Sequence, residues 1–217
     1  MDQQPTLQSP PQLAAGQVRH GEVFAPSGEA GGAALALAFS LDLAGAGDVR
    51  PWLWVQDAAA LRRGGRPYGP GLPEALRHRL IHVAAKTAQD ALFALEEGLR
   101  CRDLAFVIGE VTGNPAALNL TASRRLSLAA ERHGTALWLV RLDAARDLGS
   151  ARMRWQARAA PSLSPRWNPQ APGKAAWRAE LFRARAHPPG TWVLEEATDA
   201  LNLRQAQAEP LEAAAHG

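Results

Sequence analysis

The 217-residue sequence predicts an α/β domain in which helices flank a mostly parallel sheet that ends in antiparallel strands. Between residues 21 and 140, short apolar runs alternate with helical patterns, as they do in βαβ units with a right-handed parallel sheet. Strict apolar–polar alternation over residues 151–157 then predicts a half-buried strand. A hairpin pattern around residues 187–190 (HPPG) predicts that the last strands are antiparallel.

The first predicted elements lie in residues 21–43, where a short strand, a Gly-rich turn and a helix from Ala33 to Leu43 follow one another. This is the layout of a phosphate-binding loop. The working motif G-x-x-x-x-G-K-[ST] supplies a lysine for the β- and γ-phosphates and a hydroxyl for Mg²⁺. With Gly31 as its second glycine, Gly32 takes the lysine position and Ala33 the hydroxyl position, and no register supplies either group. We therefore expect a nucleotide-binding framework without its chemistry, not an enzyme, and no cofactor.

The next elements in order are strands at 52–55, 80–84, 104–108 and 136–140 and helices at 87–100 and 121–133, with a Gly/Pro-rich loop at 62–73. Thr87 and Asp90 form a capping box for the first helix. We expect Thr121 to cap the second helix and Gly134 to end it.

The termini and composition predict a single domain at residues 16–196 between two tails. Residues 1–15 are polar and Pro-rich and are predicted to be disordered, and residues 197–217 are predicted to be a flexible acidic tail of frayed helix or disorder. The single cysteine, Cys101, excludes an internal disulfide framework. We see no secretory signal, and the longest apolar run is shorter than the ~20 residues of a membrane span. These features predict a soluble, cytoplasmic protein without a membrane partner.

Two carboxylates follow strands where a nucleotide enzyme carries its catalytic and Mg²⁺-binding acids. Asp57 and Glu110 each stand one place away from those positions, and a one-residue slip turns a strand side chain to the other face. We therefore expect both to be surface or loop carboxylates. His78 and His82 have helical metal-ligand spacing, but the segment reads as a strand without a third ligand, so no metal site is expected.

Positive charge is concentrated in residues 141–185, which hold nine Arg and one Lys against three acidic residues. Aromatic residues lie among these charges, a combination that can bind single-stranded nucleic acid. The candidate surface for a nucleic acid or an acidic protein partner consists of Arg152, Arg154, Arg158, Arg183 and Arg185. Alternation alone offers a second interpretation, in which Trp155 is core and the arginines form a solvated sheet face.

Three segments together, EEGLRCR, TASRRLSLAAE and SARMRW, resemble the ImuA family, and the likeness covers about residues 16–196. ImuA is a RecA-like protein of bacterial SOS mutagenesis operons. The resemblance implies a RecA-like core, and the ATP-binding and hydrolysing positions of RecA fall on Pro26, Gly32, Ala33, Ala58 and Gly109, none of which keeps the needed group. It thus implies a pseudo-ATPase. The loops that hold DNA in RecA would fall near residues 113–120 and 142–150.

The resemblance also implies a non-catalytic accessory role in SOS-induced, error-prone translesion DNA synthesis. The implied partners are ImuB, an inactive Y-family polymerase relative, together with RecA and an error-prone DnaE-type polymerase, with any DNA contact indirect. Three other functions stay open: a SulA-like inhibitor of cell division, a divergent nucleotide-binding ATPase, and a DNA-binding module that uses the basic face.

Overall fold

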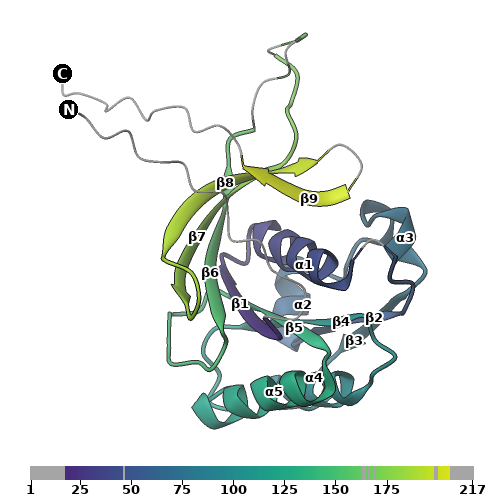
Figure 1. The fold of residues 1–217 in the computed structure, drawn as a ribbon, viewed down its shortest axis with the longest axis vertical. Helices are drawn as coiled ribbons and strands as arrows, with labels where there is room; N and C mark the ends of the chain where they lie inside the picture. Colours follow the sequence, from purple (N-terminus) through teal and green to yellow (C-terminus); the bar gives the residue numbers. More distant parts are fainter. Residues whose placement is uncertain are drawn as a thin grey trace, which may run out of the picture.

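The computed structural model describes residues 18–45, 47–162, 165, 167–168, 170–197 and 200–205. Within these residues a nine-stranded sheet has the order β3-β2-β4-β5-β1-β6-β7-β8-β9 (Figure 1). The five neighbouring pairs from β3 to β6 are parallel, and the three from β6 to β9 are antiparallel. The predicted fold class, mostly parallel with an antiparallel end, is confirmed.

The strands, in chain order, are β1 His20–Ala25, β2 Trp52–Gln56, β3 Leu80–Ala84, β4 Phe106–Thr112, β5 Ala136–Leu142, β6 Met153–Ala160, β7 Ala176–Ala184, β8 Gly190–Ala197 and β9 Ala200–Gln205. The helices are α1 Gly31–Ala44, α2 Ala58–Gly64, α3 Glu74–Arg77, α4 Ala88–Arg100 and α5 Leu120–His133, with a 3₁₀ turn at Gly69–Gly71.

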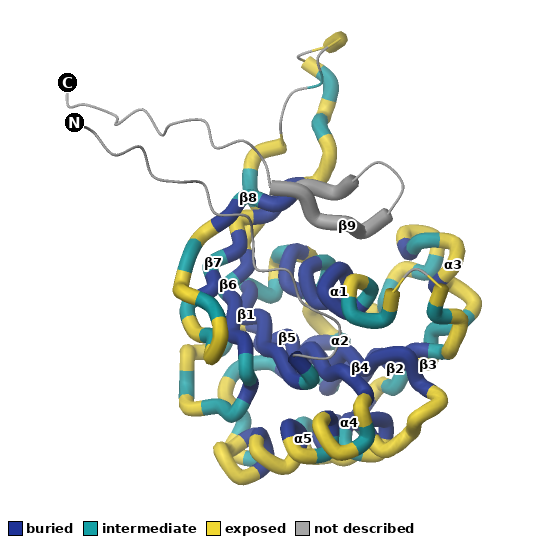
Figure 2. Tube along the Cα trace, viewed as in Figure 1, coloured by how far each residue is buried: buried dark blue, intermediate teal, exposed yellow. Residues whose placement is uncertain are grey.

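Helices cover the parallel part of the sheet on both faces (Figure 1). Helices α4 and α5 lie on one face over an aliphatic core, and α1 lies on the other over a core rich in tryptophan. Figure 2 shows that the central strands carry much of the buried chain. The sheet faces are apolar because parallel strands covered on both sides have no solvated face.

Helix α1 is enclosed on two sides. Its Phe39 ring lies 4.6 Å from the Trp138 ring of β5 and 5.1 Å from the Trp155 ring of β6. The antiparallel end of the sheet curls over the helix, so that β9 lies against it (Figure 1). This enclosure explains why the α1 sequence is apolar almost throughout instead of showing one polar face.

Several local predictions are confirmed. Thr87 caps α4, accepting a hydrogen bond from the Asp90 N–H at 3.1 Å. Gly134 ends α5 in the left-handed conformation at φ 76°. Trp155 is fully buried in the core, as the second interpretation of the basic segment expected.

Other local predictions were wrong. Asn119 caps α5 in place of Thr121, since its side-chain oxygen accepts from the Ala122 N–H at 2.9 Å. Strand β4 does not stop at 108 but pairs with β5 as far as Thr112. Residues 200–205 form strand β9 instead of frayed helix, because β8 offers an edge for backbone pairing.

Both tails predicted from composition, residues 1–15 and the stretch after 205, lie outside the described residues. Among the described residues, no helix combines the length and apolar character that crossing a bilayer requires.

Candidate functional site

Two carboxylates tie the loop between β1 and α1 to other parts of the chain. The Asp143 carboxylate accepts hydrogen bonds from the Ser27 N–H at 2.9 Å and from its hydroxyl at 2.6 Å, and it also pairs with Arg63. The Glu29 carboxylate reaches β6 and accepts from the Ala159 N–H at 2.6 Å. These contacts fix the loop internally, where a phosphate-binding loop would use its polar groups on a ligand.

The two glycines that begin α1 are needed for packing. A Cβ atom on Gly32 would lie 2.6 Å from the Ala25 Cβ and 3.1 Å from Val140 Cγ1. A Cβ on Gly31 would lie 2.8 Å from Trp177 Cδ1, whereas one on Gly28 would have no neighbour within 4 Å. The helix therefore approaches the sheet too closely for any side chain at position 32, including the lysine that a phosphate-binding loop would need there.

Beside this loop lies a cavity of about 420 Å³ at the carboxyl ends of the parallel strands. Ligands of open parallel sheets bind at this edge. The loop and Ala33 form one wall, and residues 64–68 form another. Trp54, Gln56 and Glu110 line it from the ends of β2 and β4.

Glu110 is buried in this cavity wall, with only 6% of its surface exposed. Gln56 Nε2 donates to its carboxylate at 2.5 Å, and the Gln56 side-chain oxygen is hydrogen-bonded to His82 Nε2 at 2.8 Å. Burial raises the pKa of the Glu110 carboxyl above its usual value, while the hydrogen bond from Gln56 opposes the rise. The expectation of a surface or loop carboxylate was wrong because β4 continues beside β2 and pairs Glu110 with Gln56.

Asp57 is likewise buried, 5% exposed, and serves a structural purpose. Its carboxylate accepts from the Ala60 N–H at 2.7 Å as the N-cap of α2 and from the Thr112 N–H at 3.0 Å. It therefore joins the end of β4 to the start of α2. No group of three or more possible metal ligands lies close together among the described residues.

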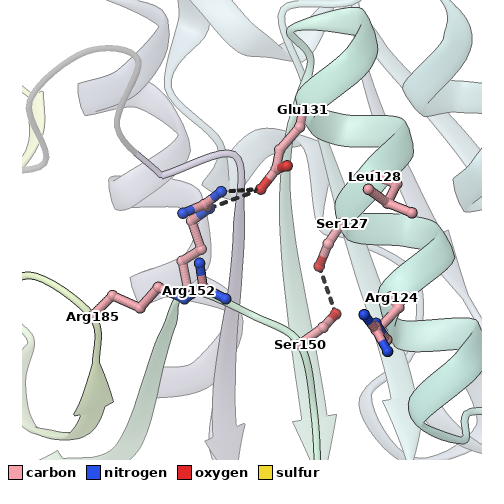
Figure 3. A pocket seen from close by; sticks show the side chains of 7 residues that line it. All are labelled: Arg124, Ser127, Leu128, Glu131, Ser150, Arg152 and Arg185. Carbon is pink, nitrogen blue, oxygen red and sulfur yellow. Dashed lines mark hydrogen bonds and ion pairs between the residues drawn. The ribbon is translucent and has the colours of Figure 1, made fainter.

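Two of the predicted surface arginines, Arg152 and Arg185, meet at a second, smaller cavity of about 200 Å³, here called the arginine groove (Figure 3). Helix α5 supplies the other wall. The lining residues are Arg124, Ser127, Leu128, Glu131, Ser150, Arg152 and Arg185. Arg152 pairs with Glu131 at 2.5 Å, whereas Arg124 and Arg185 form no ion pair with any described residue.

Hydroxyl groups form the floor of the arginine groove. Ser150 Oγ lies 2.6 Å from Ser127 Oγ (Figure 3). Beneath them, Ser123 Oγ lies 3.0 Å from Ser150 Oγ, and His20 Nδ1 lies 2.7 Å from Ser127 Oγ. Burial and the nearby Arg154 lower the pKa of His20 to about 3, so this imidazole is neutral at physiological pH. The floor is thus uncharged and the positive charge of the groove comes from its walls.

Arg154 does not belong to the surface. It is 3% exposed, its Nε donates to Glu22 at 2.6 Å, and Asp147 accepts from it at 2.6 Å through the backbone carbonyl. Arg141, also buried, pairs with Asp147 at 3.1 Å and lies 3.7 Å from Glu22. The expectation of a solvated face was wrong for Arg154 because β1 places Glu22 beside it and residues 143–152 cover both.

The remaining predicted arginines, Arg158 and Arg183, are exposed. Arg158 stands directly opposite Arg178 in the β6–β7 pairing. The two segments where RecA's DNA loops would fall are tied together, because Asn114 donates to the Ala145 carbonyl at 3.0 Å and accepts from the Ala145 N–H at 2.7 Å.

Several residues of the buried ionic cluster and of the two cavities are not evident from the sequence. Glu22, of the buried cluster, lies in a short apolar segment that carries no sign of an ion pair. Gln56, of the larger cavity, is a neutral residue whose carboxylate neighbour is the one that suggests chemistry. Arg124 and Leu128 could have been found, since they stand four residues apart on one exposed stripe of a predicted helix.

The fold and the cavity together define an α/β protein with the layout of a nucleotide-binding protein, in which the loop is held by the chain's own carboxylates and close-packed glycines. No protein-family model matches this chain. The chain is a homologue of Protein ImuA from Caulobacter vibrioides, in strain NA1000 / CB15N and in strain ATCC 19089 / CB 15. Each is 34% identical over 153 residues, which cover 66% of this chain and 59% of the relative. The chain thus spans only about 59% of the length of these relatives.

Proposed function

We propose that this protein is a non-catalytic accessory protein of SOS-induced, error-prone translesion DNA synthesis that acts through protein–protein contacts. The homology to Protein ImuA and the resemblance of residues 16–196 to the RecA-like ImuA family support the biological setting. The partners proposed on that basis are an ImuB-like relative of Y-family polymerases, RecA, and an error-prone DnaE-type polymerase.

One observation carries the non-catalytic part of this proposal, and it is the close approach of Gly32 to Ala25. A triphosphate site needs a lysine at this position to neutralise the β- and γ-phosphates. A Cβ atom at position 32 would lie only 2.6 Å from the Ala25 Cβ, which leaves no room for a side chain unless α1 moves away from β1. In addition, the buried carboxyl of Glu110 lines the cavity, and its negative charge would repel a bound phosphate.

The arginine groove is the surface we propose for the protein contact. Arg124 and Arg185 have no ionic partner among the described residues, and Leu128 beside them is 65% exposed. Guanidinium groups bind carboxylates through paired hydrogen bonds, and an exposed leucine contributes apolar area. None of the described residues that line the groove is aromatic, so they offer no platform for base stacking. The groove therefore suits an acidic protein segment better than a single-stranded nucleic acid.

The test is affinity purification from cells after DNA damage, comparing the wild type with the double variant Arg124→Gln/Arg185→Gln. Arg158→Gln is the matched control, because it removes an exposed arginine outside the groove that makes no ion pair with any residue the structure describes. We expect the wild type and the control to recover RecA or an ImuB-like protein and the double variant to recover clearly less.

Recovery of neither partner by the wild type would overturn the proposal. Co-purification of the division protein FtsZ with filamentous growth on overexpression would instead support a SulA-like function. Micromolar binding of Mg·ATP with turnover would support a divergent ATPase.

A further inference from the structure

The cavity of about 420 Å³ beside the β1–α1 loop has a buried carboxylate in its wall, and no buried cation stands among the described residues that line it. Glu110 forms no ion pair with any described residue, and the side-chain donors beside it, the Gln56 amide and the Trp54 indole, are both neutral. Gln56 is itself fixed, because its other side-chain atom is bonded to His82 and its Nε2 also donates to the Gly65 carbonyl at 3.0 Å. The carboxylate is therefore held in a defined place.

The arginines near this cavity are not placed to neutralise Glu110. Arg63 lines the rim, but its guanidinium is bound to the Asp143 carboxylate and the Ser27 hydroxyl. Arg66, also on the rim, is exposed and makes no ion pair with a described residue. A second buried carboxylate, Asp57, lies close enough to add to the negative potential at Glu110.

Aromatic rings complete the lining. The buried Trp54 lies two residues before Gln56 in β2, so both side chains are on the same face of the sheet. Tyr68, on the opposite wall, is 74% exposed. Aromatic faces attract guanidinium and ammonium groups, and the attraction is strongest where water is excluded. A carboxylate with aromatic neighbours in one cavity is a combination that selects cations.

We infer that this cavity binds a guanidinium or alkylammonium group, which pairs with the Glu110 carboxylate between Trp54 and Tyr68. The volume of about 420 Å³ lies within the range of small-ligand sites and accommodates an arginine side chain. The cation can come from a free amine such as agmatine or from an arginine of a partner protein. In either case the site occupies the sheet edge where nucleotide-binding proteins of parallel-sheet layout hold an anion, but it prefers the opposite charge.

Isothermal titration calorimetry of the full chain tests this inference with three probes: agmatine, the peptide acetyl-Gly-Arg-Gly-amide, and Mg·ATP. We expect agmatine and the peptide to bind and Mg·ATP not to compete with them. Stronger binding of agmatine would identify a free amine as the source, and stronger binding of the peptide would identify a protein side chain.

Glu110→Gln is the decisive variant, because it keeps the shape and the hydrogen bonding of the side chain and removes its charge. We expect it to weaken agmatine binding by about tenfold or more, the effect of losing a close opposite charge. Glu97→Gln, which neutralises an exposed carboxylate on α4, is the control and should leave binding unchanged. Arg66→Gln should strengthen binding, since it removes a positive charge from the rim.

The inference fails if neither agmatine nor the peptide binds at millimolar concentration, or if Glu110→Gln binds them as the wild type does. Circular dichroism of each variant, recorded beside the calorimetry, separates loss of the site from loss of the fold. Saturable binding of Mg·ATP that displaces agmatine would overturn both this inference and the charge argument above, whereas failure of agmatine alone leaves the protein-contact function standing.

Discussion

Replacing Arg154 should cost far more stability than replacing any exposed arginine, although the sequence places it in an alternating basic strand. Its guanidinium donates to Glu22 and to the Asp147 carbonyl, both at 2.6 Å, and lies 4.9 Å from the centre of the Phe24 ring. Arg154→Ala would remove these contacts and leave Glu22, which is fully buried, with only the 3.7 Å approach of Arg141.

The expected magnitude follows from the burial of the partner. Removing one member of a buried ion pair typically destabilises a protein by about 3–5 kcal/mol, because the other charge stays buried without compensation. For a chain of this size, each kcal/mol lowers the melting temperature by roughly 2–4 °C. We therefore expect Arg154→Ala to lower Tm by about 6–20 °C.

Thermal and urea unfolding followed by circular dichroism would measure this effect, with Arg158→Ala as the matched control on the same strand. Arg158 is exposed and makes no ion pair with a described residue, so its replacement should change the free energy of unfolding by less than about 0.5 kcal/mol. The double variant Glu22→Gln/Arg154→Met should recover part of the loss, because it removes both charges. Equal stability of Arg154→Ala and Arg158→Ala would refute the assignment of a buried ionic cluster.

Three further predictions concern α1, the cavity and α5. Gly32→Ala should lower the free energy of unfolding by up to about 2 kcal/mol in urea titrations, because overpacking exceeds the gain in helix propensity, whereas Gly28→Ala should be nearly neutral. Glu110→Gln should raise Tm at neutral pH and give no gain below about pH 4. Folding raises the pKa of the Glu110 carboxyl, so ionisation of this group destabilises the wild-type protein as pH increases, and the variant avoids this loss. Melting curves recorded over a series of pH values would measure the difference. Asn119→Ala should destabilise α5 by about 1 kcal/mol and Thr121→Ala should not, as thermal melts would show.

The sequence predicted the sheet well because its signals are local. Runs such as residues 52–55 are apolar at every position, which is typical of a strand covered on both faces, and the runs of this kind became β2, β4 and β5. The run at residues 80–84, which contains His82, became the half-buried edge strand β3. Errors arose where local patterns fit two choices or where the deciding contact was distant in sequence. Asn119 and Thr121 both suit an N-cap, and their local patterns do not distinguish them. Strand β4 continues past residue 108 because β2 and β5 pair with it on both sides.

The sites were harder to predict than the fold. The arginine groove joins residues 124–131, 150–152 and 185, and only the last two segments lay in the predicted basic region. Glu110 and Arg154 were both expected at the surface, yet each is buried by a partner at least 54 residues away in sequence. The alternation of a strand predicts which residues share a face of the sheet. Whether that face is exposed to water depends on the chain segment that packs over it, which the strand sequence does not reveal.

The position of α1 also bears on how the protein emerges from the ribosome. The helix is made early, at residues 31–44, but part of its cover, Trp177 and the strand β9, is synthesised more than 130 residues later. During that interval an almost wholly apolar helix has only half of its final surroundings, a situation that exposes nascent chains to aggregation. Chains truncated before β7 should therefore depend on chaperones. Soluble expression should return only when the chain includes the antiparallel strands β7, β8 and β9.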